Sequence, residues 1–346
     1  MKHPEIFIDF LEKSVNLNST RLIRLEQKVG VVESQIISSA YKPKILDISI
    51  HGSYAHGTII KPPKLRHSFD ADMALYIREQ PNWSPKDYID RLYYRLKEIS
   101  HYSKIVSRST RCVTIDYADD FHLDIVPIIQ RNSFLFTAKY KICNRRDNIF
   151  EQTDGPGFDD WLDEKNEILD DDYLIKVTRL LKYLRDIKGR FSCKSILLTT
   201  LIATQVQKED HARFSDLGSA LTILIGRLDD FLEENPKMPI IENPVLVGEN
   251  FNRHWDSSKY STFRTHISMY RTWIDDAYSE TEPELSVLKW RKVFGDGFGS
   301  SVDLHSKKFL SQCQREVSDL ENDNSGSGLW VIGATAAAAL LLALKG

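Results

Sequence analysis

The chain has 346 residues, of which 42% are hydrophobic and 27% charged. This length fits two domains of ordinary size or one large α/β domain, and the composition excludes a wholly disordered chain, collagen and a coiled-coil array. Lys and Arg number 46 against 49 Asp and Glu, which leaves a net charge of −3. No overall basic field would hold a polyanion, so phosphate binding requires a local site. The four scattered cysteines contain no C-x-x-C pair, which excludes a zinc finger by spacing and indicates no secreted disulfide framework.

Helix and strand patterns alternate in the N-terminal part. Residues 1–14 carry charges through their apolar run and lack a cleavage site, so we expect a cytoplasmic body and no signal peptide. Apolar residues at helical spacing predict helices over residues 4–14, 17–38 and 86–100. Strands are predicted over residues 45–50, 70–77, 104–108, 112–117 and 121–129, the last closed by Pro127 and the polar residues 130–132. About the first 150 residues are therefore predicted to be mixed α/β.

From Phe158 onward the hydrophobic pattern has helical spacing. Helices are predicted over residues 172–188, 195–207, 217–234 and 257–279. A proline-punctuated loop over residues 235–244 divides this helical part.

The C-terminus differs in composition from the rest of the chain. Polar residues 321–328 are typical of a flexible linker, and residues 329–344 carry no charge. As a helix, those 16 residues would extend about 24 Å, slightly short of a hydrocarbon core of about 30 Å. Trp330 and Lys345 stand where interfacial anchors belong. We expect an apolar tail helix over residues 329–346 that contacts the membrane; the alternative is a helix docked on the body or on a partner protein.

The segment most informative about chemistry is residues 48–77. A predicted strand leads into Gly52-Ser53, and a helix start is expected there. Glycine allows a phosphate to approach the backbone, and the free N–H groups of a helix start attract anions. The next strand carries Asp70 and Asp72, which point to the same side because side chains alternate along a strand. Two such carboxylates repel each other unless a cation lies between them, and Mg²⁺ is the cation that also keeps water and phosphate ligands.

A third carboxylate, Asp124, lies in an apolar predicted strand where an isolated charge would be costly. We expect this strand to lie beside the one that carries Asp70 and Asp72. A lone D-x-D pair on a strand is usually a solvated edge. The apolar flanks, the preceding Gly-Ser and the third acid favour a metal-dependent site instead.

Together these residues form the string Gly52-Ser53-x-x-x-Gly57-Thr58, Asp70-x-Asp72 and Asp124-x-Val126-Pro127. The string resembles nucleotidyltransferases of the polymerase-beta type, and most closely the bacterial CD-NTases, relatives of cyclic GMP-AMP synthase and oligoadenylate synthase that act in the anti-phage systems called CBASS. Weaker similarities extend the resemblance over roughly residues 1–300, at residues 153–161, 179–186, 194–195 and 290–298.

The resemblance implies an α+β fold with two lobes and the active site in the cleft between them. Residues 1–157 would form the N-terminal helices and a nucleotidyltransferase core of mixed sheet and helices. Residues 158–320 would form a helical domain that completes the cleft, followed by the linker 321–328 and the tail 329–346.

The resemblance also implies roles for single residues. Asp70, Asp72 and Asp124 would be catalytic and would hold two Mg²⁺ ions, with Mn²⁺ as a substitute. The nucleotide would be bound by Gly52, Ser53, Lys182 and Ser195. Two alternatives stay open at this point. Lys182 and Arg185 could be solvated helix charges, and Ser195 could be an ordinary helix N-cap.

The expected reaction is nucleotidyl transfer between NTPs, with ATP among them, to give a cyclic di- or trinucleotide that reaches a downstream effector protein. Transfer to an RNA 3′ end or a protein hydroxyl is the alternative, although the lack of a basic surplus argues against a large nucleic acid. A third hypothesis, a nucleotide-binding scaffold without activity, conflicts with the three intact acids. For the C-terminus, the resemblance offers conjugation through Gly346 as a rival to membrane contact.

Three histidines, His51, His56 and His67, surround the Gly-Ser motif. Their spacing matches no zinc pattern, and magnesium does not need imidazole ligands. We therefore interpret them as residues that flank the motif and have no catalytic role.

Overall fold

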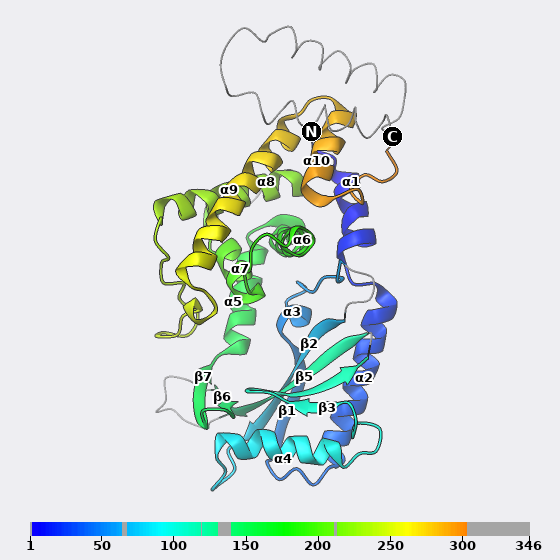
Figure 1. The fold of residues 1–346 in the computed structure, drawn as a ribbon, viewed down its shortest axis with the longest axis vertical. Helices are drawn as coiled ribbons and strands as arrows, with labels where there is room; N and C mark the ends of the chain where they lie inside the picture. The colour runs from blue at the N-terminus through cyan, green and yellow to red at the C-terminus, as the bar shows by residue number, and fades with distance from the viewer. Residues whose placement is uncertain (1, 64–67, 119, 131–139, 211–212, 303–346) are drawn as a thin grey trace.

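A mixed sheet forms one half of the molecule and a group of helices forms the other (Figure 1). The computed structural model describes residues 2–63, 68–118, 120–130, 140–210 and 213–302. The predicted linker and tail, residues 321–346, lie outside these ranges, and so does His67. Within the described ranges, none of the helices combines the length and the apolar character that crossing a bilayer requires.

Residues 2–153 contain all the strands of the described part of the chain. The helices of this stretch are α1 (Pro4–Phe10), a π-helical turn (Leu11–Val15), α2 (Ser19–Ser38), α3 (Gly52–Ala55) and α4 (Pro85–Lys97). Its strands are β1 (Ile45–His51), β2 (Phe69–Arg78), β3 (Val106–Arg108), β4 (Val113–Tyr117), β5 (Phe121–Gln130), β6 (Tyr140–Asn144) and β7 (Ile149–Thr153).

The second half is helical. Its helices are α5 (Gly155–Glu167), α6 (Tyr173–Lys188), α7 (Ser195–Ala203), α8 (Leu217–Glu234), α9 (Ser257–Ser279) and α10 (Pro283–Phe294). Helix α7 ends four residues before the predicted boundary at residue 207, and α5 and α10 are absent from the predicted helices. The α+β class expected from the sequence is confirmed.

The sheet has the strand order β1-β2-β5-β4-β3 in its described part, with β6 paired to β5 and β7 to β6. Strands β2 and β5 run parallel to each other, and the other pairs are antiparallel. The central β2 is almost continuously buried, as expected of a strand covered on both faces.

Two strand predictions need correction. Strands β6 and β7 were missed, because their short sequences are half polar and are stabilised as strands by pairing with β5 and with each other. Pro127 does not close β5, which continues to Gln130. Proline is tolerated there because β4 pairs with β5 only up to Ile125 and β6 only from Ile128 onward. The missing N–H group therefore falls between the two antiparallel partners.

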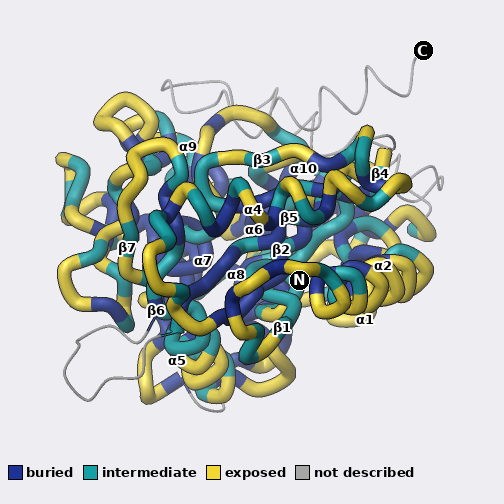
Figure 2. Tube along the Cα trace, turned by 90° about the horizontal axis from the view of Figure 1, so that it is seen from below, coloured by how far each residue is buried: buried dark blue, intermediate teal, exposed yellow. Residues whose placement is uncertain are grey.

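Two helices cover the sheet and bury apolar side chains against it. Helix α4 begins with Pro85 after a capping box in which Ser84 and Asp87 bond reciprocally. Its buried face shares one core with α2 and with the strands. Figure 2 shows the buried residues following β2 and β5 through the centre, while α2 is exposed on its outer side.

The helical half has its own core, and the N-terminus of the chain belongs to it. Phe7 on α1 lies edge to face with Trp290 on α10, with ring centroids 4.9 Å apart. It also contacts Phe298, again at 4.9 Å. The segment that resembled the family's C-terminal motif, residues 290–298, therefore anchors α1 against the helical half.

Candidate functional site

The three aspartates predicted to act together lie on two adjacent strands. Asp72 on β2 is paired in register with Asp124 on β5, and Asp70 is paired with His122. Because the two strands are parallel neighbours, Asp72 and Asp124 stand side by side. The prediction that the Asp124 strand lies beside the strand of Asp70 and Asp72 is confirmed.

The protein compensates the charge of Asp72 only in part. Burial, followed by the nearby charge of Asp124, raises the pKa of Asp72 to about 6. Asp124 accepts a hydrogen bond from Thr114 Oγ1 at 2.5 Å, which orients its carboxylate. A buried carboxylate with a raised pKa beside a second carboxylate forms a site that a cation would stabilise.

Asp70 is more accessible than its two partners. Its side chain is 84% exposed, and its Oδ1 lies 3.3 Å from Nδ1 of His122. The other nitrogen of that imidazole lies 3.4 Å from Asp116. Asp70 can therefore turn toward the other two acids at little cost in burial.

The donor set fits a hard divalent cation, because all three groups are carboxylates and the pKa of Asp72 is raised in the absence of a cation. In the described part of the chain, no three His, Cys, Asp or Glu side chains already converge closely enough to hold a metal ion. Asp72 and Asp124 would provide the paired ligands, and Asp70 would complete the set after turning.

A tight turn approaches Asp72 from β1. The backbone of Gly52 has φ +65°, a left-handed conformation that favours glycine. A Cβ atom at this position would lie 2.5 Å from Asp72 Oδ2. The expected helix start is present as the single turn α3, and it places Gly52 and Ser53 against the acidic strand.

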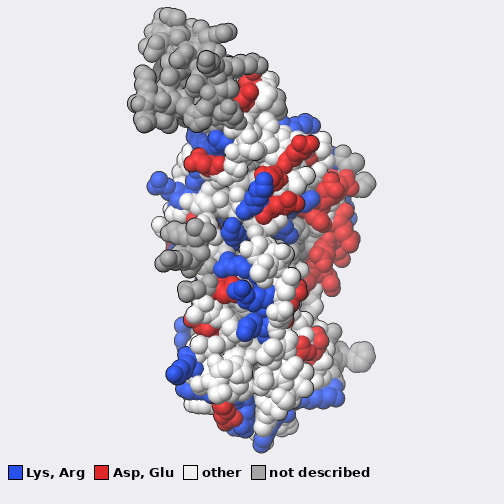
Figure 3. Space-filling view, turned by 90° about the vertical axis from the view of Figure 1, so that its right-hand side faces the viewer, with Lys and Arg blue, Asp and Glu red and all other residues white. Residues whose placement is uncertain are grey.

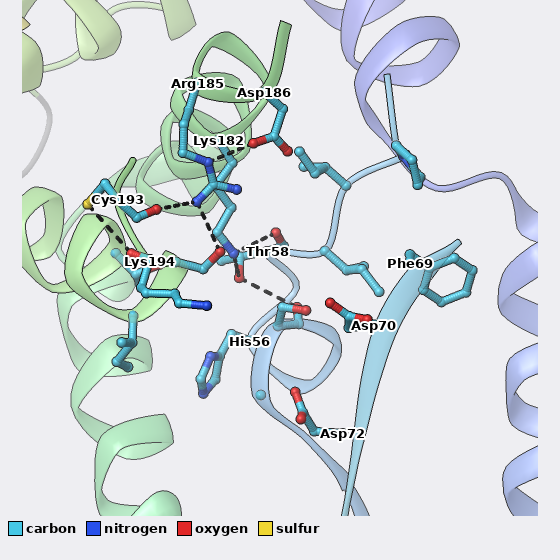
Figure 4. Close-up of a pocket in the computed structure, with 18 of the residues that line it drawn as sticks. His56, Thr58, Phe69, Asp70, Asp72, Lys182, Arg185, Asp186, Cys193 and Lys194 are labelled. Atoms are coloured by element: carbon cyan, nitrogen blue, oxygen red, sulfur yellow. Dashed lines mark hydrogen bonds and ion pairs between the residues drawn. The ribbon is translucent and has the colours of Figure 1, made fainter. Parts of the chain in front are cut away.

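Lys182 reaches this turn from α6 (Figure 4). Its ammonium group donates to the carbonyl oxygen of Thr58 at 3.0 Å and to Thr58 Oγ1 at 2.9 Å. Only 3% of its surface is exposed. Burial, followed by the charge of Arg185, lowers the pKa of Lys182 to about 7. The alternative that Lys182 is a solvated helix charge is therefore wrong.

Ser195 lies next to Arg185 at the start of α7. Arg185 donates to Ser195 Oγ at 3.3 Å and to the carbonyl oxygen of Cys193 at 2.8 Å, and it pairs with Asp186. Arg185 is thus fixed by partners and is not a solvated charge. The N-cap of α7 is Lys194, so the alternative of Ser195 as the cap residue is also wrong.

All seven residues predicted from the sequence line one cavity of about 1020 Å³ between the sheet and α6 and α7. Sheet and turn contribute Gly52, Ser53, Asp70, Asp72 and Asp124, and the helices contribute Lys182 and Ser195. In Figure 4, Asp70 and Asp72 project from β2 toward the space below Lys182. The cavity therefore places the three predicted acids across from Lys182.

Sequence reasoning missed His254, which also lines the cavity. Phe158 and Lys194 line it too, and they belong to the segments 153–161 and 194–195 that resembled the family. Burial, followed by the charge of Arg253, lowers the pKa of His254. His254 lies in no motif with fixed spacing, and only the fold of the helical half brings it to the site.

His51 and His56 both contact Asp159 on α5. His51 Nδ1 lies 3.6 Å from Asp159 Oδ2, and His56 Nε2 contacts Asp159 Oδ1. Burial would raise the pKa of Asp159, but the hydrogen bonds and charges of the two histidines outweigh it and lower the pKa to about 2. The spacing of the histidines gave no sign of this shared partner.

Comparison with known proteins identifies the class of fold around this cavity. Residues 1–166 match the family described as Second Messenger Oligonucleotide or Dinucleotide Synthetase domain. A c-di-GMP synthase of Roseivirga ehrenbergii is 25% identical over 233 residues, which cover 66% of this chain and 54% of that protein. The match thus spans about half the length of that relative. A cyclic AMP-AMP-AMP synthase of Escherichia coli is 24% identical over 315 residues, or 84% of this chain and 95% of the relative.

Solved structures share the fold at low identity. CdnC of E. coli MS115-1, determined with ATP, superposes with a TM-score of 0.68 at 21% identity and covers 86% of this chain and 99% of its own. DncV of Vibrio cholerae, a cyclic AMP-GMP synthase in complex with a linear intermediate, has a TM-score of 0.68 at 14% identity, covering 86% and 96%. These similarities establish the fold.

Proposed function

Because residues 1–166 match the model of the Second Messenger Oligonucleotide or Dinucleotide Synthetase domain and the chain shares its fold with the CD-NTase CdnG, we propose that it joins NTPs into a cyclic di- or trinucleotide. One observation carries this proposal. Three carboxylates on β2 and β5 face the buried cation Lys182 across a single cavity that also contains the Gly52-Ser53 turn.

Different residues of the cavity would bind the triphosphate and the metal. Backbone N–H groups at Gly52 and Ser53, together with Lys182 and Ser195, would bind the triphosphate. The carboxylates of Asp70, Asp72 and Asp124 would hold divalent metal, with Mg²⁺ expected at two positions and Mn²⁺ as a substitute. Bound there, such metal lowers the pKa of the attacking hydroxyl and offsets charge on the leaving group.

In each transfer, a ribose hydroxyl oxygen would form a bond to the α-phosphorus of an NTP. The bond from that phosphorus to the bridging oxygen of the β-phosphate would break, and pyrophosphate would leave. Asp124 would accept the hydroxyl proton, since Thr114 already orients its carboxylate. A last transfer within the linear product would close the ring, the second transfer for a dinucleotide and the third for a trinucleotide, and each transfer would release one pyrophosphate.

The charge distribution favours small substrates over a large RNA. The chain has a net charge of −3. On the face shown in Figure 3, basic side chains along the middle adjoin acidic side chains along one edge, and no continuous basic surface covers it. A polynucleotide would need several phosphate contacts along such a surface. We therefore favour NTPs, with ATP among them, over an RNA 3′ end.

By the same proposal, the product would be a second messenger in anti-phage defence of the CBASS type. Its downstream effector protein would meet this chain only through the product, so no protein interface with the effector is required. The catalytic body would act in the cytoplasm, and the C-terminal tail would make the membrane contact.

The test is to incubate the full chain with all four NTPs and Mg²⁺ and to identify the products by mass spectrometry. We expect a cyclic oligonucleotide that resists phosphatase, released together with pyrophosphate. The double variant Asp70→Ala/Asp72→Ala, purified in parallel, should make none. Product formation by the double variant would contradict the proposal, and so would transfer only to added RNA or protein.

A further inference from the structure

The turn that presents Gly52 and Ser53 is held at both ends by one carboxylate. His51 precedes α3 as its N-cap residue, and His56 follows it as the C-cap. His51 contacts one oxygen of Asp159 at 3.6 Å, and His56 contacts the other. Asp159 belongs to α5, so this contact joins the turn to the helical half.

Packing fixes both imidazoles in this arrangement. Gly155 at the start of α5 lies so close to His51 that a Cβ atom there would be 2.5 Å from the ring atom Cε1. The ring of His56 packs on Phe158 with centroids 5.5 Å apart, and its side chain is only 10% exposed. The two histidines therefore have little freedom to find other partners.

The same turn is also held from α6, but on its C-terminal side. Arg179 donates to the carbonyl oxygen of Gly57 and to Asn16 Oδ1, the latter at 3.1 Å. Lys182 donates to Thr58. Both contacts lie beyond His56. Asp159, by contrast, makes polar contacts with residues on both sides of Gly52 and Ser53.

Asp159 does not line the cavity, whereas His56 does. A direct contact with substrate is therefore not its role. A phosphate-binding turn needs its N–H groups fixed to within about 0.5 Å, and a displacement of about 1 Å can cost about 100-fold in rate. A carboxylate that grips both ends of the turn meets this need.

We propose that Asp159 is a positioning residue that holds the Gly52-Ser53 turn in its phosphate-binding geometry through His51 and His56. The proposal rests on the proposed function for its kinetic consequence. Its structural consequence, an ordered turn in the absence of substrate, does not depend on any activity.

The test compares Asp159→Asn with Asp160→Asn. Asparagine keeps the size of the side chain and removes its charge, and Asp160 is the exposed neighbour on the same helix. Hydrogen–deuterium exchange of the substrate-free protein is measured on peptides that cover residues 51–58. We expect faster exchange in this segment for Asp159→Asn alone, with unchanged exchange in β5 and α8.

The kinetic arm measures KM and kcat for NTPs, together with the dissociation constant of a nonhydrolysable NTP analogue. Asp159→Asn should raise KM and the dissociation constant by about tenfold, with a smaller effect on kcat, because the turn acts on triphosphate binding. Asp159→Glu should recover part of the loss, since it restores the charge. Wild-type protein that makes no product would defeat the proposed function, while the exchange and the analogue binding would still test the positioning role.

A double-mutant cycle with His56→Gln provides the second line of evidence. If Asp159 acts through His56, then the double variant should bind the analogue as well as whichever single variant binds it less tightly. Additive losses would overturn the proposal. Unchanged exchange at residues 51–58 in Asp159→Asn would also overturn it, and so would a loss of protection spread evenly over the whole protein. Should Asp159→Asn fail to fold, His51→Gln and His56→Gln are compared by the same exchange measurement. Unchanged exchange at residues 51–58 in both variants would overturn the proposal.

Discussion

Asp72 and Asp124 are direct neighbours across the parallel strands β2 and β5. The pKa of Asp72 is raised to about 6 by burial and by the nearby charge of Asp124. The protein keeps this unfavourable pair in the wall of the cavity between the sheet and the helical half. A pair of this kind is a cost to folding that is offset when a cation binds between the two groups.

The first prediction concerns the stability cost of Asp72. The folded-state pKa of about 6 lies above the ordinary value of 3.8, so the charged form costs stability. The cost is absent well below pH 4, grows between pH 4 and 6, and is complete above pH 6. Asp72→Asn should therefore stabilise the metal-free protein by about 3 kcal/mol at most at pH 7.5, and by less at pH 4.5. Urea unfolding at the two pH values measures this difference.

Asp70→Asn is the matched control, because that side chain is 84% exposed and its charge should cost little. Both variants should lose NTP turnover. A destabilised Asp72→Asn protein would show that the carboxylate stabilises the fold. Retained turnover in Asp72→Asn would show that it is not a required metal ligand.

The second prediction concerns the close approach of Gly52 to Asp72. Gly52→Ala would place a Cβ atom 2.5 Å from Asp72 Oδ2 on a backbone with φ +65°. Gly248→Ala provides the control, because Gly248 has φ +84° and a Cβ atom there would meet no described neighbour within 4 Å. Both variants should lose about 1–2 kcal/mol of stability from the left-handed backbone. Only Gly52→Ala should also lose most of its NTP turnover, measured as pyrophosphate release, and equal activities would contradict the proposed contact.

The third prediction concerns the protonation of Lys182. Burial lowers its pKa to about 7, so the ammonium form predominates below pH 7 and is lost as the pH rises. The affinity for a nonhydrolysable NTP analogue should therefore fall as the pH rises above 7. A bound phosphate favours the ammonium form, which shifts this loss to somewhat higher pH. Lys182→Arg, which stays charged, should bind with little change from pH 7 to 9, and the measurement is a calorimetric titration at each pH. An equally steep fall in that variant would assign the pH dependence to another group.

The fourth prediction concerns the apolar C-terminal segment. Residues 329–344 carry no charge and follow the polar residues 321–328, a pattern that predicts membrane contact. Cells that express the full chain, or a version ending at Asn324, are fractionated at low salt without detergent. The full chain should enter the membrane fraction and the shortened version should not. If both forms stay in the soluble fraction, docking or conjugation through Gly346 replaces the membrane interpretation.

Much of the site could be predicted from the sequence because its residues lie in short local patterns. The alternation along residues 70–77 places Asp70 and Asp72 on one side of a strand, and Gly52-Ser53 ends the preceding strand. Their resemblance to a known motif then linked them with Asp124. Local patterns of this kind can be interpreted without knowing the fold, because strand geometry alone determines which side chains share a face.

The strands β6 and β7 could not be predicted in the same way. Each is five residues long and mixes polar with apolar side chains. Their extended conformation depends on the hydrogen bonds they exchange with β5 and with each other, and no local signal records that pairing.

By itself, then, the sequence determined the class of fold, the acidic strand and the Gly52-Ser53 turn. Tertiary structure alone decided that Lys182 is buried against Thr58, and that Asp159 meets His51 and His56 although it lies 103 residues beyond His56 in the chain. The hydrophobic pattern of α6 shows which face of the helix is apolar. It does not show what covers Lys182, which lies next to that face. Burial and hydrogen-bond partners depend on the packing of α5 and α6 against the turn, and that packing is set by contacts between segments distant in sequence.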